Sequence, residues 1–104
     1  MIRNLILALL LCATQLSFSQ NKFTISGEIK DSKTGEKLVG VTVYNEKTKS
    51  GTFSNNSGYY SLSLQKGNYK ISYSFIGYET VEKEIKHSKD IKLNIQLIPS
   101  IKNI

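Results

Sequence analysis

Hydrophobic and polar residues alternate along most of the chain after residue 20. In a β-strand successive side chains point to opposite faces, so a period of two predicts strands that each bury one face. Polar segments with glycine separate these stretches at intervals of about eight to twelve residues, which is typical of the turns in a sandwich or small barrel. The pattern predicts seven strands, at residues 23–30, 41–45, 52–54, 59–64, 69–75, 78–85 and 91–97.

The strand at 69–75 carries the largest apolar side chains. Tyr69, Ile71, Tyr73 and Phe75 share one face, and we interpret that face as core, with Tyr73 and Leu93 buried together. The alternative is an exposed aromatic platform that stacks on sugar rings. After this strand, Gly77 is expected at a turn with positive φ. Tyr78 is expected at a sandwich corner, with its ring packed and its hydroxyl bonded to the backbone.

The strand at 78–85 is weaker, because Val81 and Ile85 stand among alternating glutamates and lysines. Such charges are typical of edge strands, where they discourage pairing with other chains. We therefore predict that this strand lies at a sheet edge. No window of ten residues after residue 20 shows helical periodicity. The sequence thus predicts a single all-β domain.

The first nineteen residues have the pattern of a secretory signal peptide. Arg3 precedes an apolar run at residues 5–13, and the small residues Ser17 and Ser19 follow it. We predict a helical signal peptide at 1–19, with cleavage after Ser19. The lone cysteine, Cys12, lies within it, either as a small hydrophobic residue or as a lipidation site.

The chain has a formal net charge of +6. Removal of the signal peptide would also remove Arg3 and leave a net charge of +5. The remaining positive charges are lysines spread along the sequence rather than clustered. Nucleic-acid-binding domains concentrate Lys and Arg on one face and carry recognisable motifs, which are missing here. We therefore interpret the lysines as a solvated face and expect no nucleic-acid partner.

Few residues of this chain could carry catalysis or hold a metal. The single histidine, His87, lies in a polar segment with Ser88 and Asp90, whereas catalytic triads are assembled across a fold. One histidine and no cysteine after residue 19 leave no usual zinc ligand set. The carboxylates Glu79, Glu82 and Glu84 lack the spacing of a calcium loop. The sequence therefore predicts a non-enzymatic domain with no catalytic residue, no cofactor-binding residue and no metal ligand.

Short motifs follow one another along residues 23–98: Ser26-Gly27, Thr34-Gly35-Glu36, Gly40-Val41, Gly51-Thr52, Gly58-Tyr59-Tyr60, Gly67-Asn68-Tyr69 and Phe75-Ile76-Gly77-Tyr78. This ordered set resembles the carboxypeptidase regulatory-like domain. In this resemblance Asn55 starts the turn before Gly58 by bonding its own backbone. Lys37 and Val39 stand where the family commonly has proline, which weakens turn rigidity without changing the fold.

The resemblance implies a seven-stranded Greek-key β-sandwich of the transthyretin-like (prealbumin-like) type. It implies a domain at residues 20–98, followed by a linker or tail at 99–104. Such domains precede the plug of TonB-dependent outer-membrane receptors of Gram-negative bacteria, which implies an accessory domain on the periplasmic side. The expected partners are the receptor plug and barrel or periplasmic proteins of the uptake machinery, and the expected working surface is a sheet edge or the loops.

The resemblance leaves a second function open. Related domains also occur beside peptidases, in adhesins and as free-standing secreted proteins, which implies a carbohydrate-binding or adhesion module in the periplasm or outside the cell. The chain is therefore expected to be a fragment or truncated product of a receptor, or a free-standing domain.

Overall fold

The computed structural model describes residues 22–100. The signal peptide predicted at 1–19, with Cys12 and the cleavage site after Ser19, lies outside the described residues, as do residues 101–104 of the predicted tail. Within residues 22–100 every regular element is a strand, and no helix is long and apolar enough to cross a membrane.

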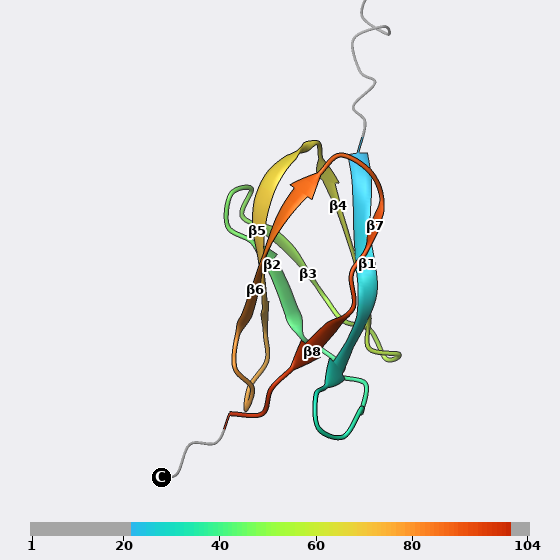
Figure 1. The fold of residues 1–104 in the computed structure, drawn as a ribbon, viewed down its shortest axis with the longest axis vertical. Coiled ribbons are helices and arrows are strands. Elements are labelled where there is room, and N and C mark those ends of the chain that lie inside the picture. Colours follow the sequence, from blue (N-terminus) through green and yellow to red (C-terminus); the bar gives the residue numbers. More distant parts are fainter. Residues whose placement is uncertain (1–21, 101–104) are drawn as a thin grey trace, which may run out of the picture.

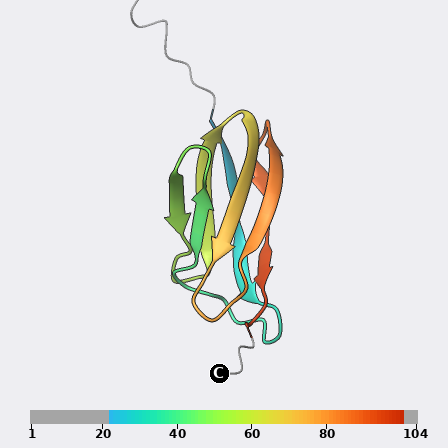
Figure 2. The same cartoon turned by 90° about the vertical axis from the view of Figure 1, so that its left-hand side faces the viewer.

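The strands form two sheets that pack face to face (Figures 1 and 2). The first sheet has the order β4-β1-β7, with β8 also paired to β1. Its strands are β4 (Tyr59–Gln65), β1 (Lys22–Asp31), β7 (Ile91–Lys92) and β8 (Ile95–Leu97). The second sheet has the order β3-β2-β5-β6. Its strands are β3 (Ser50–Phe53), β2 (Thr42–Asn45), β5 (Gly67–Ser74) and β6 (Val81–His87). The prediction of an all-β sandwich is confirmed.

The core lies between the sheets and follows the period of two in the sequence. On β5 the inward residues Tyr69, Ile71 and Tyr73 are buried, and Phe75 just beyond the strand packs against them. Burial of each such side chain is worth about 1.5–3 kcal/mol, so this face stabilises the domain instead of forming an exposed platform. Tyr73 is fully buried, whereas Leu93 is only partly buried against the same core.

The predicted turn residues adopt the expected conformations. Gly77 has a φ of 83° in the connection between β5 and β6. The side-chain oxygen of Asn55 accepts hydrogen bonds from the backbone N–H groups of Ser57 and Tyr59, at 2.9 and 3.0 Å. Both features confirm what the sequence indicated for these turns.

The strand predicted at 91–97 is divided into β7 and β8, although the register with β1 is the same on both sides of the break. At the break, the Leu93 carbonyl accepts a hydrogen bond from the hydroxyl of Tyr60, at 2.6 Å. The backbone N–H of Glu28 on β1 donates a hydrogen bond to the side-chain oxygen of Asn94, at 3.0 Å. In an uninterrupted strand this N–H would bond a backbone carbonyl, so at the break a side-chain oxygen replaces a backbone one.

Candidate functional site

The residues that the sequence singled out for chemistry do not converge. His87 ends β6 instead of lying in the following turn, and its side chain lies outside the described part of the chain. The Asp90 carboxylate accepts a hydrogen bond from the backbone N–H of Thr24, at 2.8 Å. The Glu82 carboxylate forms an ion pair with the Lys70 ammonium, at 3.7 Å. Among residues 22–100, no group of three or more His, Cys, Asp or Glu side chains could hold a metal ion. That the chain carries no catalytic, cofactor or metal residue stays a prediction.

Two tyrosine hydroxyls lie inside the core, where the sequence predicted apolar packing alone. The rings of Tyr60 and Tyr73 meet edge to face at 5.3 Å, and their hydroxyl oxygens are 2.9 Å apart. Because Tyr60 donates its proton to the Leu93 carbonyl, Tyr73 donates to Tyr60. Burial raises the pKa of both hydroxyls, so both stay protonated at neutral pH. Their exposures of 1% and 0% make this a structural pair without access to a ligand.

Asp31 and Tyr78 form a second polar contact, at the end of β1. The Tyr78 hydroxyl donates to one carboxylate oxygen of Asp31 at 2.7 Å. The other oxygen accepts the backbone N–H groups of Lys33 and Thr34, at 2.7 and 3.0 Å. Tyr78 thus sits at a corner as predicted, but the prediction that its hydroxyl bonds the backbone is wrong. A carboxylate is the stronger acceptor, and here it lies within reach.

This contact predicts acid sensitivity. The Tyr78 hydrogen bond, followed by the two backbone N–H groups, lowers the pKa of Asp31 below its ordinary value. The charged form therefore stabilises the fold above the unfolded-state pKa of about 3.9, and this stability is lost as pH falls through the lower folded-state pKa. We expect Asp31→Asn to lower the melting temperature at neutral pH and to flatten its decline on acidification, measured from about pH 7 to 2.

Tyr78→Phe should give an intermediate acid profile, because it removes the largest cause of the lowered pKa and leaves the two backbone donors. Glu46→Gln, which changes an exposed carboxylate in the turn between β2 and β3, is the control and should retain the parent profile. An Asp31→Asn variant that declines with acid as steeply as the parent chain would show that Asp31 does not carry the effect.

The sheet edges are protected against addition of another strand. β6 lies at the edge of the second sheet, as predicted, and carries Glu82, Lys83, Glu84 and Lys86. By alternation Lys83 lies on the core side, between Val81 and Ile85, where an inward charge opposes pairing with a partner strand.

The other edges are short, interrupted or flanked. β3 has four residues, and β7 and β8 have two and three, separated by the break at Leu93 and Asn94. β4 has seven residues and no charge, but β3 runs in contact with it at this corner of the sandwich. Of the two working surfaces that the sequence suggested, the loops at the two ends are therefore the more accessible.

Exposed lysines gather at one end of the sandwich, the upper end in Figure 1, where β1 begins and β6 ends. We call this surface the cationic end, and it comprises Lys22, Lys47, Lys49, Lys66, Lys86 and Lys89. Glu46 and Asp90 are the carboxylates in the same loops. None of the six lysines forms an ion pair with another residue of the described chain. The lysines are dispersed along the sequence, as stated above, but the fold brings these six exposed side chains to one end.

The opposite end, where the chain leaves the domain, carries exposed hydrophobic side chains beside the charged loop between β1 and β2. Within residues 22–100 the exposed large hydrophobic side chains are Val39, Phe53, Ile76 and Ile98. All four lie at or next to the lower ends of the strands in Figure 1, and we call this surface the apolar end. Backbone hydrogen bonds from Glu79 to Ile98 and from Ser100 to Gly77, both 2.9 Å, hold the departing chain there.

One mixed sheet and one antiparallel sheet, packed face to face, define a small β-sandwich domain over residues 22–100. Comparison with known proteins places it more closely: residues 25–104 match the CarboxypepD_reg-like domain family, and the chain belongs to that family. It is 37% identical over 93 residues to TonB-dependent receptor P39 of Formosa agariphila. These findings confirm the resemblance to the carboxypeptidase regulatory-like domain of TonB-dependent receptors. The match covers 86% of this chain but spans only 9% of the length of that receptor.

Solved structures agree on the fold. The shaft pilin SpaA of Lactobacillus rhamnosus GG matches with a TM-score of 0.56 and 16% identity, over 80–81% of this chain and about half of the pilin. A DUF3823 family protein of Bacteroides ovatus matches with a TM-score of 0.58 and 24% identity, over 76% of this chain and 44% of that protein. At these identities the likeness shows a shared β-sandwich and nothing about function.

Proposed function

We propose that the chain is a non-enzymatic accessory domain of a TonB-dependent outer-membrane uptake receptor. The observation that carries this proposal is the receptor match, which takes in most of this chain but a small fraction of the receptor. Such coverage is what one domain of a much longer protein would give. The strand orders β4-β1-β7/β8 and β3-β2-β5-β6 support the finer assignment to a seven-stranded transthyretin-like Greek key, with β7 and β8 counted as one interrupted strand.

In this proposal the protein is exported, residues 1–19 are removed, and the domain at residues 20–98 lies on the periplasmic side of the outer membrane. Residues 99–104 begin a linker to the plug. The apolar end lies beside this exit, so its exposed side chains Val39, Ile76 and Ile98 would be nearest to the receptor body. The cationic end would point away from that body, toward periplasmic proteins of the uptake machinery.

A deletion in the full-length receptor tests this function. Removing the segment that corresponds to residues 21–98 should impair growth on the transported substrate, while the receptor still reaches the outer-membrane fraction with its signal peptide removed. The control is the intact receptor expressed to the same level. Undiminished uptake at both low and high substrate concentrations would exclude a required role in transport.

A second candidate is a carbohydrate-binding or adhesion module, and one surface favours it. Phe53 is 66% exposed and projects from the outer face of the second sheet, opposite Thr42 on β2. Tyr44 lies on the same face, next to Gly51, and is half-buried. Aromatic rings on the outer face of a sheet, beside small residues, can stack on the apolar faces of sugars. Sugar binding by the chain that is lost in Phe53→Ala and retained in Ser61→Ala would favour this candidate, whereas no measurable sugar binding would remove it.

A further inference from the structure

We infer that the cationic end binds an acidic segment of a partner protein, in a shallow trough across the upper part of β5 and β6. The inference rests on the proposed function, which it deepens by naming the chemistry of the periplasmic partner. It is carried by the position of the lysines, by the hollows between them and by the absence of exposed apolar groups from this end of the described chain.

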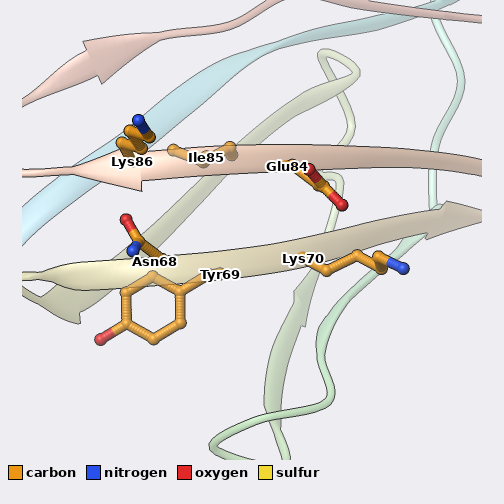
Figure 3. Close-up of a pocket in the computed structure, with 6 residues that line it drawn as sticks. All are labelled: Asn68, Tyr69, Lys70, Glu84, Ile85 and Lys86. Atoms are coloured by element: carbon orange, nitrogen blue, oxygen red, sulfur yellow. The ribbon is translucent and has the colours of Figure 1, made fainter.

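Two neighbouring hollows form the trough. One has a volume of about 450 Å³ and is lined by Lys66, Gly67, Asn68, Lys86 and Ser88. The other has a volume of about 560 Å³ and is lined by Asn68, Tyr69, Lys70, Glu84, Ile85 and Lys86. Figure 3 shows the second hollow, with its residues on the adjacent strands β5 and β6. Asn68 and Lys86 line both hollows, so the two are neighbours on this surface.

The charges within the trough are unequally neutralised. Lys70 pairs with Glu82 on the neighbouring strand. Lys66 and Lys86 form no ion pair within residues 22–100, and both are exposed. An ammonium group is a compact charge with three donors, which suits carboxylates that approach from solvent. Glu84 also lines the trough, opposite Lys70, so the unpaired positive charge lies at the end with Lys66 and Lys86. That end of the trough favours acidic side chains over neutral ones, and Asn68 and Ser88 offer further polar partners there.

The surroundings favour a protein over a glycan or a lipid. Tyr69 is the aromatic residue of the trough, yet it is only 9% exposed, and the Lys47 ammonium lies 5.4 Å from the centre of its ring. The residues that line the trough therefore present no open ring on which a sugar could stack. The exposed large hydrophobic residues of the described chain lie at the apolar end, so this end has no side chain to insert into a bilayer.

Charge reversal in the trough tests the inference with three polyanionic probes. The probes are poly-L-glutamate, polygalacturonate and vesicles that contain phosphatidylglycerol. We expect the chain to bind poly-L-glutamate most tightly, with an affinity that falls as salt rises. The double variant Lys66→Glu/Lys86→Glu should weaken this binding by roughly tenfold or more. The control Lys37→Glu/Lys92→Glu changes the net charge equally, at exposed lysines outside the cationic end, and should weaken binding by less than about twofold.

All four positions are exposed, so both double variants should melt like the parent chain. Equal weakening by the two variants would overturn the inference, because net charge alone would then explain binding. Tighter binding to polygalacturonate or to the vesicles would also overturn it, in favour of a glycan or a membrane. Absence of binding to poly-L-glutamate at low salt would also overturn the inference.

The outcome is separable from that of the proposed function. If deletion of the domain impairs uptake but Lys66→Glu/Lys86→Glu leaves poly-L-glutamate binding intact, the trough is wrong and the receptor role stands. If the variant loses binding but the deletion leaves uptake unchanged, the acidic site stands and the receptor role fails.

Discussion

Replacement of Gly27 by alanine is expected to lower the free energy of unfolding by about 1–3 kcal/mol, the range for an overfilled core. Gly27 lies on the inward face of β1, opposite Tyr60 on β4. A Cβ placed there would overlap the Leu93 carbonyl oxygen and lie 2.6 Å from the carbonyl carbon. The obstacle is backbone, which cannot turn aside as a side chain would.

The clash matters because two hydrogen bonds hold Leu93 close to Gly27. The Leu93 N–H donates to the Ser26 carbonyl at 2.7 Å, and the Leu93 carbonyl accepts from Tyr60. Relief of the clash would move the break between β7 and β8 and stretch at least one of these bonds. The glycine is therefore needed for this close approach of main chain to main chain.

Urea denaturation of the parent chain and of Gly27→Ala measures this effect. Ser61→Ala is the matched control, because Ser61 is exposed on β4 and pairs with the neighbouring residue Ser26. It should change the stability by no more than about 0.5 kcal/mol. A Gly27→Ala variant as stable as the parent would show that residues 93 and 94 shift freely, and that the break has another cause.

The sequence was sufficient to predict the strands whose burial follows strict alternation. β5 is the clearest example, because the interpretation of its apolar face as core is confirmed by the complete burial of Ile71 and Tyr73. The division of the last strand could not be predicted, since residues 91–97 alternate without interruption. The break coincides with a tertiary contact between Tyr60 and Leu93, residues 33 positions apart. Local pattern carries no signal for such a contact.

The cationic end could have been predicted from the sequence with one further step. Where successive strands run in opposite directions, alternate turns lie at the same end of the sheets. Lys47, Lys66 and Lys89 occupy successive turns of one such series, after β2, β4 and β6. These three lysines are far apart in the sequence. They come together only when each turn is assigned to one end of the sandwich. The apolar end was less accessible to prediction, because Val39 and Ile98 lie outside any strand and their exposure depends on the folded loops.

The two buried tyrosines, Tyr60 and Tyr73, are expected to contribute unequally to the free energy of unfolding, as measured by variants that each remove one hydroxyl. Tyr60→Phe should lower the free energy of unfolding by about 1–3 kcal/mol, because it removes the donor to Leu93 and the acceptor for Tyr73. Tyr73→Phe removes a single hydrogen bond and leaves the Tyr60–Leu93 bond in place. Its expected effect is about 0.5–1.5 kcal/mol.

Denaturant titration of the two single variants and of Gly27→Ala/Tyr60→Phe tests this order. Gly27→Ala is expected to displace the same Leu93 carbonyl that Tyr60 bonds, so the double variant should lose less stability than the sum of its single variants. Equal losses for Tyr60→Phe and Tyr73→Phe would contradict the direction assigned to the hydroxyl pair. Strict additivity in the double variant would contradict the shared dependence on Leu93, since independent sites add. Agreement on both measurements would show that Gly27 and Tyr60 stabilise the fold through the same Leu93 carbonyl.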